Sequence, residues 1–243
     1  MSVVVEIVVY NIESAINAQK GGADRIELCD NPAEGGTTPS FGVMEIVRQA
    51  VSMDVYAMIR PRGGDFVYSA YEYHAMKRDL EMCKRASLDG VVLGILKPDG
   101  TLDKDRCKKL IDAARPMKVT CHRAFDVTRD PFEALEACVE VGFDRILTSG
   151  QAQTAPDGIS LLTQLVQKAA NRISIMPGAG INETNAKHIV DQTGAKEIHF
   201  SARQFQPSTF NSTIRFTDKL PQETGKFVAN AERVRKVVEA LGN

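Results

Sequence analysis

The sequence lacks every cysteine pattern that would build a disulfide framework or a structural zinc site. Its five cysteines, an odd number, are scattered at positions 29, 83, 107, 121 and 138, and none belongs to a C-x-x-C pair. Disulfide-rich secreted domains and zinc knuckles both need paired, closely spaced cysteines. The scattered thiols therefore predict a protein of a reducing compartment, for which the cytoplasm is the simplest assignment.

Long apolar runs and an excess of charge of one sign are absent as well. A membrane-spanning helix needs roughly 20 consecutive apolar residues, and no stretch of the chain comes near that length. Residues 2–9 have the pattern of a strand and not that of a signal peptide. The 30 basic and 31 acidic residues are interspersed and give a net charge of −1, whereas nucleic-acid-binding domains usually carry a clustered basic surface. We therefore expect neither a membrane nor nucleic acid as a partner.

Short β-prone runs that end in charged, hydroxyl or glycine residues recur along the chain. The most informative run is Ile59–Phe66, in which two arginines and an aspartate surround a Pro-Gly-Gly turn. Comparable strand ends lie at His122–Asp126, Thr148–Gly150 and Met176–Gly180. Functional groups at one end of successive strands are the layout of a (β/α) barrel with its site on a single face.

The whole chain, 1–243, is predicted to be one TIM (β/α)8 barrel, because a barrel of this kind typically has about 250 residues. An open doubly wound sheet is the alternative, but the chain has eight strand–helix units and no G-x-G-x-x-G after the first strand. The expected strands are 3–9, 24–29, 54–60, 90–95, 117–122, 143–148, 172–176 and 196–201. The expected helices are 12–20, 40–52, 68–87, 102–115, 130–141, 158–171, 183–192 and 226–241. Thr38-Pro39, Asp130-Pro131 and Asn182-x-x-Asn185 are candidate helix starts.

Residues 203–224 interrupt this alternation, because they are rich in Ser, Thr and Pro and show no clear period. We expect an irregular loop before the last helix. A loop of this length is uncommon in a compact domain and serves as a lid, as an oligomer contact or as a disordered segment.

The expected strands place polar side chains on the inward face. Alternation along each strand puts successive side chains on opposite faces. The inward set would be Glu6, Arg25, Glu27, Arg60, His122 and His199. Unpaired buried charges cost several kcal/mol each, so these groups must pair with one another or with a ligand. Buried ion pairs Glu6–Arg25 and Glu27–Arg60 are the structural interpretation. A functional site at the strand ends is the other.

If the barrel is an enzyme, His122 and Glu27 are the candidates for proton transfer, and His199 is the other histidine on a strand. Arg60 and Arg62 would hold an anion, and Asp126 could join Glu27 and His122 around a divalent ion. No lysine lies at the closing end of the sixth strand, which argues against a Schiff-base aldolase. Glycine turns and hydroxyls at the later strand ends suit an anion. These anion-site candidates are Ser149, Gly178, Gly180 and Ser201.

Several motifs together resemble the CutC family, whose members are called copper homeostasis proteins. They are GGADRIELC (21–29), EGGTTPS (34–40), MIRPRGGDF (58–66), HRAFD (122–126), LTSG (147–150) and MPGAGI (176–181). The resemblance runs from Val5 to about Arg203. It implies a TIM barrel, a cytoplasmic location, a homo-oligomer (dimer or tetramer) and copper(I) as the metal.

The resemblance implies Cys29 as the metal ligand. Copper(I) prefers two or three soft sulfur ligands, and some relatives carry a second cysteine where this sequence has Val8. Met58 could reach inward beside it. Cys121 is out of phase with the inward face, and the cysteines at 83, 107 and 138 have the helical spacing of small core residues.

Three functions follow as hypotheses. The first is copper(I) handling through Cys29. The second is an enzyme that acts by acid/base chemistry on a small metabolite bearing a phosphate or carboxylate. The third is a barrel that serves only to bind a partner, although a charged interior argues against it.

Overall fold

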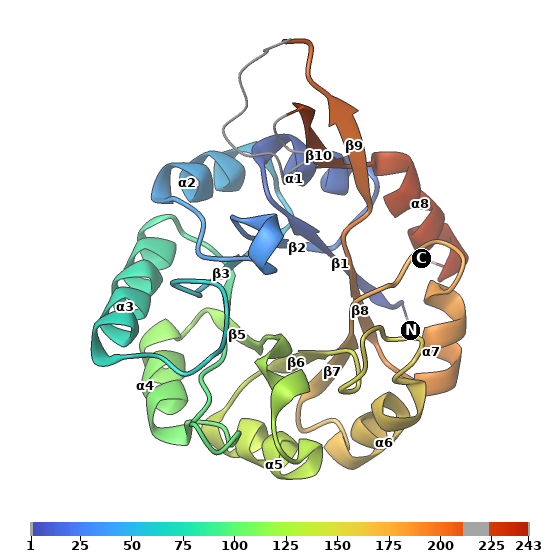
Figure 1. The fold of residues 1–243 in the computed structure, drawn as a ribbon. Coiled ribbons are helices and arrows are strands. Elements are labelled where there is room, and N and C mark those ends of the chain that lie inside the picture. Colours follow the sequence, from blue (N-terminus) through green and yellow to red (C-terminus); the bar gives the residue numbers. More distant parts are fainter. Residues whose placement is uncertain (1, 211–223, 243) are drawn as a thin grey trace.

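The computed structural model describes residues 2–210 and 224–242, and the described chain forms a parallel eight-stranded barrel (Figure 1). The strands follow one another in the order β7-β6-β5-β4-β3-β2-β1-β8, and a parallel bridge between Gly178 and His199 joins the two ends. The TIM-barrel prediction is therefore confirmed. The barrel strands are β1 Val4–Val9, β2 Arg25–Leu28, β3 Asp54–Met58, β4 Gly90–Leu93, β5 Lys118–Cys121, β6 Arg145–Thr148, β7 Ser174–Pro177 and β8 Glu197–Phe200.

In the described part of the chain, eight α-helices surround the barrel, in alternation with the strands (Figure 1). They are α1 Ile12–Lys20, α2 Phe41–Ala50, α3 Ala70–Arg85, α4 Lys104–Ala114, α5 Pro131–Val141, α6 Ile159–Ala169, α7 Ala186–Thr193 and α8 Ala231–Ala240. Two 3-10 turns, η1 Pro32–Glu34 and η2 Arg123–Val127, follow β2 and β5. Within the described residues, none of the helices has the length and apolar character needed to span a bilayer.

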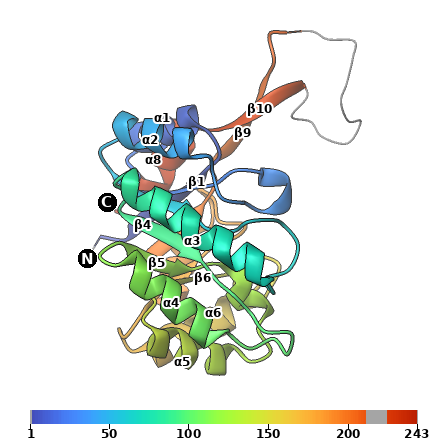
Figure 2. The same ribbon diagram turned by 90° about the vertical axis from the view of Figure 1, so that its left-hand side faces the viewer.

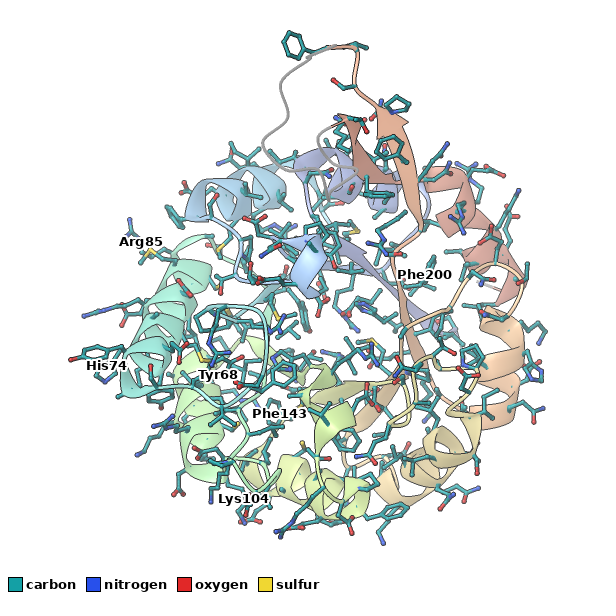
Figure 3. The ribbon with its side chains drawn as sticks, in the orientation of Figure 1. Tyr68, His74, Arg85, Lys104, Phe143 and Phe200 are labelled. Atoms are coloured by element: carbon teal, nitrogen blue, oxygen red, sulfur yellow. The ribbon has the colours of Figure 1, made fainter. Side chains whose placement is uncertain are left out.

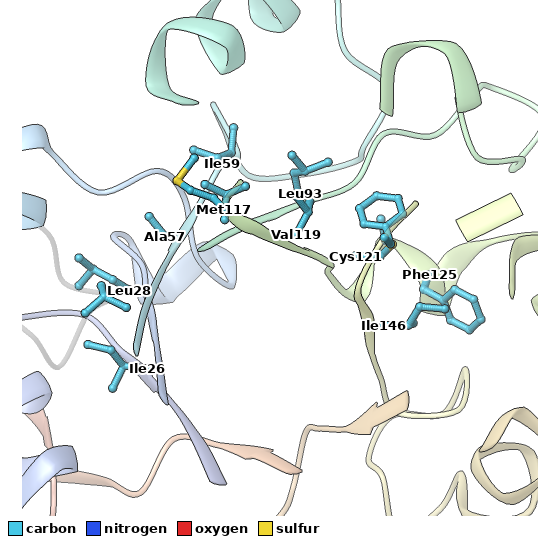
Figure 4. Close-up of a cluster of buried hydrophobic side chains, with 14 of the residues drawn as sticks. Ile26, Leu28, Ala57, Ile59, Leu93, Met117, Val119, Cys121, Phe125 and Ile146 are labelled. Carbon is cyan, nitrogen blue, oxygen red and sulfur yellow. The ribbon is translucent and has the colours of Figure 1, made fainter. Parts of the chain in front are cut away.

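The main hydrophobic core lies between the barrel strands and the helices. Figure 4 shows outward-facing residues of successive strands, such as Ile26, Val119 and Ile146, in this layer. Cys121 is part of it, as its phase along β5 predicted. The cysteines at 83, 107 and 138 are also fully buried there, so four of the five thiols are packing groups. Because this layer takes up the outward-facing apolar side chains of the strands, the barrel interior is filled by a different set of residues.

The predicted helix starts are correct at two of three positions. Asp130 accepts hydrogen bonds from the N–H groups of Phe132 and Glu133 and caps α5. Helix α2 is capped by Ser40 and not by the Thr38-Pro39 pair. Asn185 is the N-cap residue of α7, but its side chain makes no bond to the helix; it accepts from the N–H of Asn182 instead.

An antiparallel ribbon replaces part of the irregular loop expected at 203–224. Strand β9 (Arg203–Pro207) pairs with β10 (Gly225–Ala229), and Figure 2 shows the ribbon extending away from the barrel. The prediction of a helix from 226 is wrong, because Phe227 and Val228 are β-prone and find a partner strand in β9. Asn230 then caps α8. The rest of the predicted loop, 211–223, lies outside the described residues.

Candidate functional site

A cavity of about 560 Å³ opens at the carboxyl ends of the barrel strands. Its walls come from β1, β2, β3, β6 and β8 and from the loops that follow β2, β3, β5 and β7. The lining residues are Val8, Tyr10, Glu27, Pro32, Glu34, Gly35, Met58, Arg60, Phe66, His122, Arg123, Leu147, Ala179, Gly180, Ile181, His199, Phe200, Ser201 and Arg203. Figure 3 labels Phe200, which lines the cavity. His74 points outward from α3 in the same view and is exposed, and His188 is exposed as well. His122 and His199 are therefore the histidines that reach the site.

Four charged side chains inside the barrel form a paired layer. Arg25 forms ion pairs with both Glu6 and Glu197, and Arg145 pairs with Glu197 at 2.9 Å. The predicted Glu6–Arg25 pair is thus confirmed. Arg145 and Glu197 were missed by the sequence reasoning, although Glu197 lies two residues before His199 and therefore shares its face. Two carboxylates and two guanidinium groups make this layer electrically balanced.

Glu6 is anchored from a second side by His199. Burial alone would raise the pKa of Glu6, but Arg25 and His199 beside it hold that pKa far below its ordinary value. Glu6 is therefore an ionised acceptor, and His199 Nδ1 donates to it at 2.8 Å. The other ring nitrogen of His199 lies 3.8 Å from a carboxylate oxygen of Glu27. His199 thus connects the paired layer to the cavity.

Glu27 has one carboxylate oxygen held and one without a partner. The Cys29 thiol lies 3.6 Å from Oε2 as a donor, and His199 faces the same oxygen. Within the described residues, Oε1 is buried and has no hydrogen-bond partner. Burial raises the pKa of Glu27 to about 7, against the opposing effect of His199. A carboxyl group with this pKa can both take and return a proton near neutral pH.

His122 begins the η2 turn and is held as a neutral ring. Its Nδ1 accepts a hydrogen bond from the N–H of Ala124 at 3.2 Å, and the Phe66 ring packs on it with centroids 4.8 Å apart. Burial and the Arg60 guanidinium lower the pKa of His122 to about 3. Nδ1 is an acceptor, so the ring proton of the neutral form lies on Nε2. That atom is buried and has no partner among the described residues.

Arg60 organises the loops at the mouth of the cavity. Its guanidinium donates to the carbonyl oxygens of Glu34, Gly36 and Gly64, at 2.7, 2.8 and 2.9 Å. The predicted Glu27–Arg60 ion pair is therefore wrong, because backbone carbonyls take the donors of Arg60. Its Nε is buried and lacks a partner within the described chain.

Arg62 and Asp126 lie outside the cavity lining. Arg62 forms ion pairs with Glu72 and Asp65, so its charge is already compensated. Asp126 accepts from Thr148 Oγ1, from the N–H groups of Ser149 and Gln151 and from Arg123. These contacts join the loop after β5 to the loop after β6, and they make Asp126 a structural anchor in this geometry.

Only some of the residues predicted to form an anion site lie at the cavity. Gly180 and Ser201 line the cavity. The Gly178 N–H is taken by the carbonyl of Thr148 at 3.0 Å, and Ser149 is fully buried against Asp126 and Ala152. Arg203, which follows Ser201 in the sequence expected to bind an anion, also lines the cavity. A second cationic lining residue, Arg123, was missed, because sequence alternation does not extend into loops. Ala179 and Gly180 both adopt positive φ, at 74° and 72°, and this tight turn forms part of the cavity wall.

Cys29 is the one thiol in the barrel interior, in a small cluster with Tyr56, Met58 and Val92. Burial raises the pKa of the Cys29 thiol well above its ordinary value, and Glu27 adds to the effect. Among the described residues, no group of three or more His, Cys, Asp or Glu side chains is placed to hold a metal ion. The divalent-ion site considered for Glu27, His122 and Asp126 is therefore not formed.

Replacing Glu27 with glutamine is expected to favour the folded state increasingly as pH rises. The pKa of Glu27 moves from an ordinary 4.5 to about 7 on folding. The folded wild type holds this proton more tightly than the unfolded chain, so it loses roughly 3 kcal/mol of stability between these two pH values. Glutamine does not titrate, and the opposite contribution of His122 is common to both proteins. Glu27 also raises the pKa of His199, so its replacement reduces the stability that His199 loses with rising pH and changes the difference in the same direction. Urea unfolding of both proteins at acidic and neutral pH measures the difference, and a pH-independent difference would contradict the expectation.

Comparisons with known proteins agree with the motifs. Residues 3–204 match the family model described as the CutC family. A human copper homeostasis protein cutC homolog is 48% identical over 211 residues, which are 87% of this chain and 76% of that protein. A CutC family protein from Parabacteroides distasonis is 50% identical over 204 residues, 84% of each chain.

Solved structures give the same result. The crystal structure of a CutC protein from Streptococcus agalactiae matches with a TM-score of 0.79 and 35% identity, over 82% of this chain and 98% of that chain. The thiamine phosphate pyrophosphorylase of Pyrococcus furiosus, at 16% identity and a TM-score of 0.61, shows a likeness of fold alone. With the family match covering most of the barrel, the chain belongs to the CutC family.

Proposed function

We propose that the chain is an enzyme that performs acid/base chemistry on a small metabolite bearing a phosphate or carboxylate. One observation carries this proposal: three residues that line a single cavity each have a buried polar atom without a partner in the described structure. These atoms are Glu27 Oε1, Arg60 Nε and His122 Nε2. Buried polar groups are nearly always paired, so unpaired ones around a cavity support a ligand that completes them.

The polar groups divide into two kinds. Glu27, with a pKa of about 7, suits proton transfer. Arg123 and Arg203 supply positive charge at the cavity wall, and the turn at Ala179 and Gly180 forms another part of that wall. This division fits a ligand whose anionic end lies near the arginines and whose reacting end lies near Glu27.

A thermal-unfolding screen of small phosphates and carboxylates tests the proposal. A true ligand at 100 times its dissociation constant should stabilise the wild type by about 2.7 kcal/mol. His122→Gln should lose that stabilisation, whereas the matched change at the exposed His74 should keep it. Equal stabilisation of all three proteins, or none by any compound, would count against the proposal.

Copper(I) binding through Cys29 is the second candidate. It is favoured by the packing of two sulfur-bearing side chains, Cys29 and Met58, in one inner cluster, and by the name of the human relative, a copper homeostasis protein. A side chain at Gly36 would contact both of them, since an added Cβ would lie 3.1 Å from Cys29 Sγ and 3.7 Å from Met58 Cε. The raised pKa of the Cys29 thiol opposes binding, because copper(I) takes the thiolate.

A copper(I) titration against a chromophoric competing chelator separates the two candidates. Copper handling predicts stoichiometric binding that is lost in Cys29→Ser, retained in the control Cys83→Ser and stronger at higher pH. Equal binding by all three proteins, or no competition with the chelator, would exclude Cys29 as a copper anchor.

We further propose that the protein works in the cytoplasm as a homo-oligomer, a dimer or tetramer. Five free, buried cysteines suit a reducing compartment. Phe210, beside the β9–β10 ribbon, is 77% exposed, and a large exposed aromatic residue suits an interface. Light scattering on the eluted protein gives the mass, and a monomer at micromolar concentration would refute the oligomer.

A further inference from the structure

The fixed tautomer of His122 defines what its free nitrogen can do. An imidazole that accepts at Nδ1 and is neutral must donate at Nε2. Ala124 N–H supplies the bond to Nδ1, and its position at the start of the η2 turn holds the ring in place. Because its pKa is lowered to about 3, the ring is neutral throughout the physiological range. His122 therefore offers an uncharged N–H donor and cannot act there as an ordinary cationic acid.

Phe66 and Gly94 both lie against the ring. The Phe66 ring contacts His122 in a tilted arrangement and also lies under the Arg60 guanidinium, 5.0 Å from it. A Cβ on Gly94 would lie 2.8 Å from His122 Cε1, so the ring occupies the space that any larger residue would need. The N–H donor is thus held by contacts on several sides, as a preorganised stabiliser of developing charge should be.

Glu27 offers the complementary group, a base with one assigned atom. Its Oε2 is held by the Cys29 thiol and faces His199, while Oε1 has no partner among the described residues. Glu27 comes from β2 and His122 follows β5, and both line the same cavity. A small molecule in that cavity therefore has both a carboxylate and a neutral N–H donor in its wall.

We propose that the reaction is proton transfer at a carbon next to a carbonyl group, that is, enolisation. A carboxylate base and a neutral histidine donor that line one cavity are an arrangement suited to this chemistry. Glu27 Oε1 removes the proton from the carbon. The C–H electron pair then forms the carbon–carbon double bond, and the carbonyl π pair moves onto oxygen, where His122 Nε2–H stabilises it. The hydroxyl proton of the intermediate then passes to the enediolate oxygen, the hydroxyl oxygen becomes the new carbonyl, and Glu27 returns its proton to the former carbonyl carbon. The product is therefore the isomeric hydroxy carbonyl compound, and no redox partner is needed.

The substrate class follows from the same groups and rests on the proposed function. It is an α-hydroxy aldehyde or ketone that carries a phosphate or carboxylate. The carbonyl end lies between Glu27 and His122, and the anionic end lies toward Arg123, Arg203 and the turn at Gly180. A cavity of about 560 Å³ accommodates such a small molecule.

Two phosphates of similar size provide the test. Phosphoglycolohydroxamate mimics the planar enediolate, and glycerol 3-phosphate has the same anionic end without a carbonyl. Calorimetric titration should show the hydroxamate binding at least about 100-fold more tightly, as analogues of a transition state do. Glu27→Gln and His122→Gln should remove most of this preference, because each deletes one of the two interactions with the enediolate.

The outcomes separate the inference from the function on which it rests. If both phosphates bind with similar affinity, anion binding stands and enolisation is overturned. If neither binds at millimolar concentration, the proposed function fails for phosphates and the inference fails with it. Nitrogen NMR of His122 gives an independent readout. A neutral ring protonated at Nε2 across neutral pH is expected, and a cationic ring or a proton on Nδ1 would overturn the inference.

Discussion

Replacing Arg25 with methionine is expected to lower the free energy of unfolding by about 3 to 5 kcal/mol. The change leaves Glu6 fully buried without its main counter-charge, and it leaves Glu197 with Arg145 alone. Methionine fills part of the volume of arginine, so the loss reports the stranded carboxylates more than a cavity. Urea unfolding at neutral pH, followed by far-ultraviolet circular dichroism, measures the difference.

Arg78→Met is the matched control. Arg78 pairs with Glu81 on the exposed face of α3, where its side chain is 79% accessible. Exposed pairs contribute at most about 1 kcal/mol, so this variant should unfold close to the wild type. Equal stability of the two variants would show that the interior ion pairs contribute nothing beyond surface pairs.

Removing the Asp126 carboxylate should destabilise the protein by about 3 kcal/mol. In Asp126→Ala the N–H groups of Ser149 and Gln151 and the hydroxyl of Thr148 lose their acceptor. A buried donor left unpaired costs roughly 1–3 kcal/mol, and water entering the loop would offset part of that sum. Chemical unfolding gives the magnitude.

Asp65→Ala serves as the comparison for this change. Asp65 also accepts from an arginine and from a backbone N–H, but its side chain is 71% exposed. We expect a loss below about 1 kcal/mol. If Asp126→Ala is as stable as Asp65→Ala but inactive, Asp126 acts in the reaction and not as a loop anchor.

The fold could be predicted because strand and helix signals alternate eight times with short connections. The charged residues inside the barrel could be predicted in the same way. Alternation along each strand places Glu6, Arg25, Glu27 and His199 on the inward face. The ribbon was missed because β10 contains only five residues, and its partner strand lies on the far side of the segment 208–224. Pairing over that distance leaves no local periodic signal.

The site was predicted less completely, because loop side chains do not follow alternation. Arg60 and Arg62 look equivalent in the sequence, yet one reaches three carbonyl oxygens at the cavity and the other turns to Glu72. Asp126 was expected near the reacting groups, but apart from Arg123 its donors come from residues 22 to 25 positions later. Contacts between separate loops are set by tertiary packing, which a single sequence does not display.

The paired layer inside the barrel also determines when the barrel can close during synthesis. Glu6 and Arg25 emerge early from the ribosome, whereas Glu197, which pairs with both Arg25 and Arg145, emerges near the end. Until β8 arrives, two arginines face an unfinished interior and are better solvated by water than buried. The barrel can therefore close around these charges only after β8, its last strand, has been made. A nascent chain that stalls before residue 197 should remain open and sensitive to proteases.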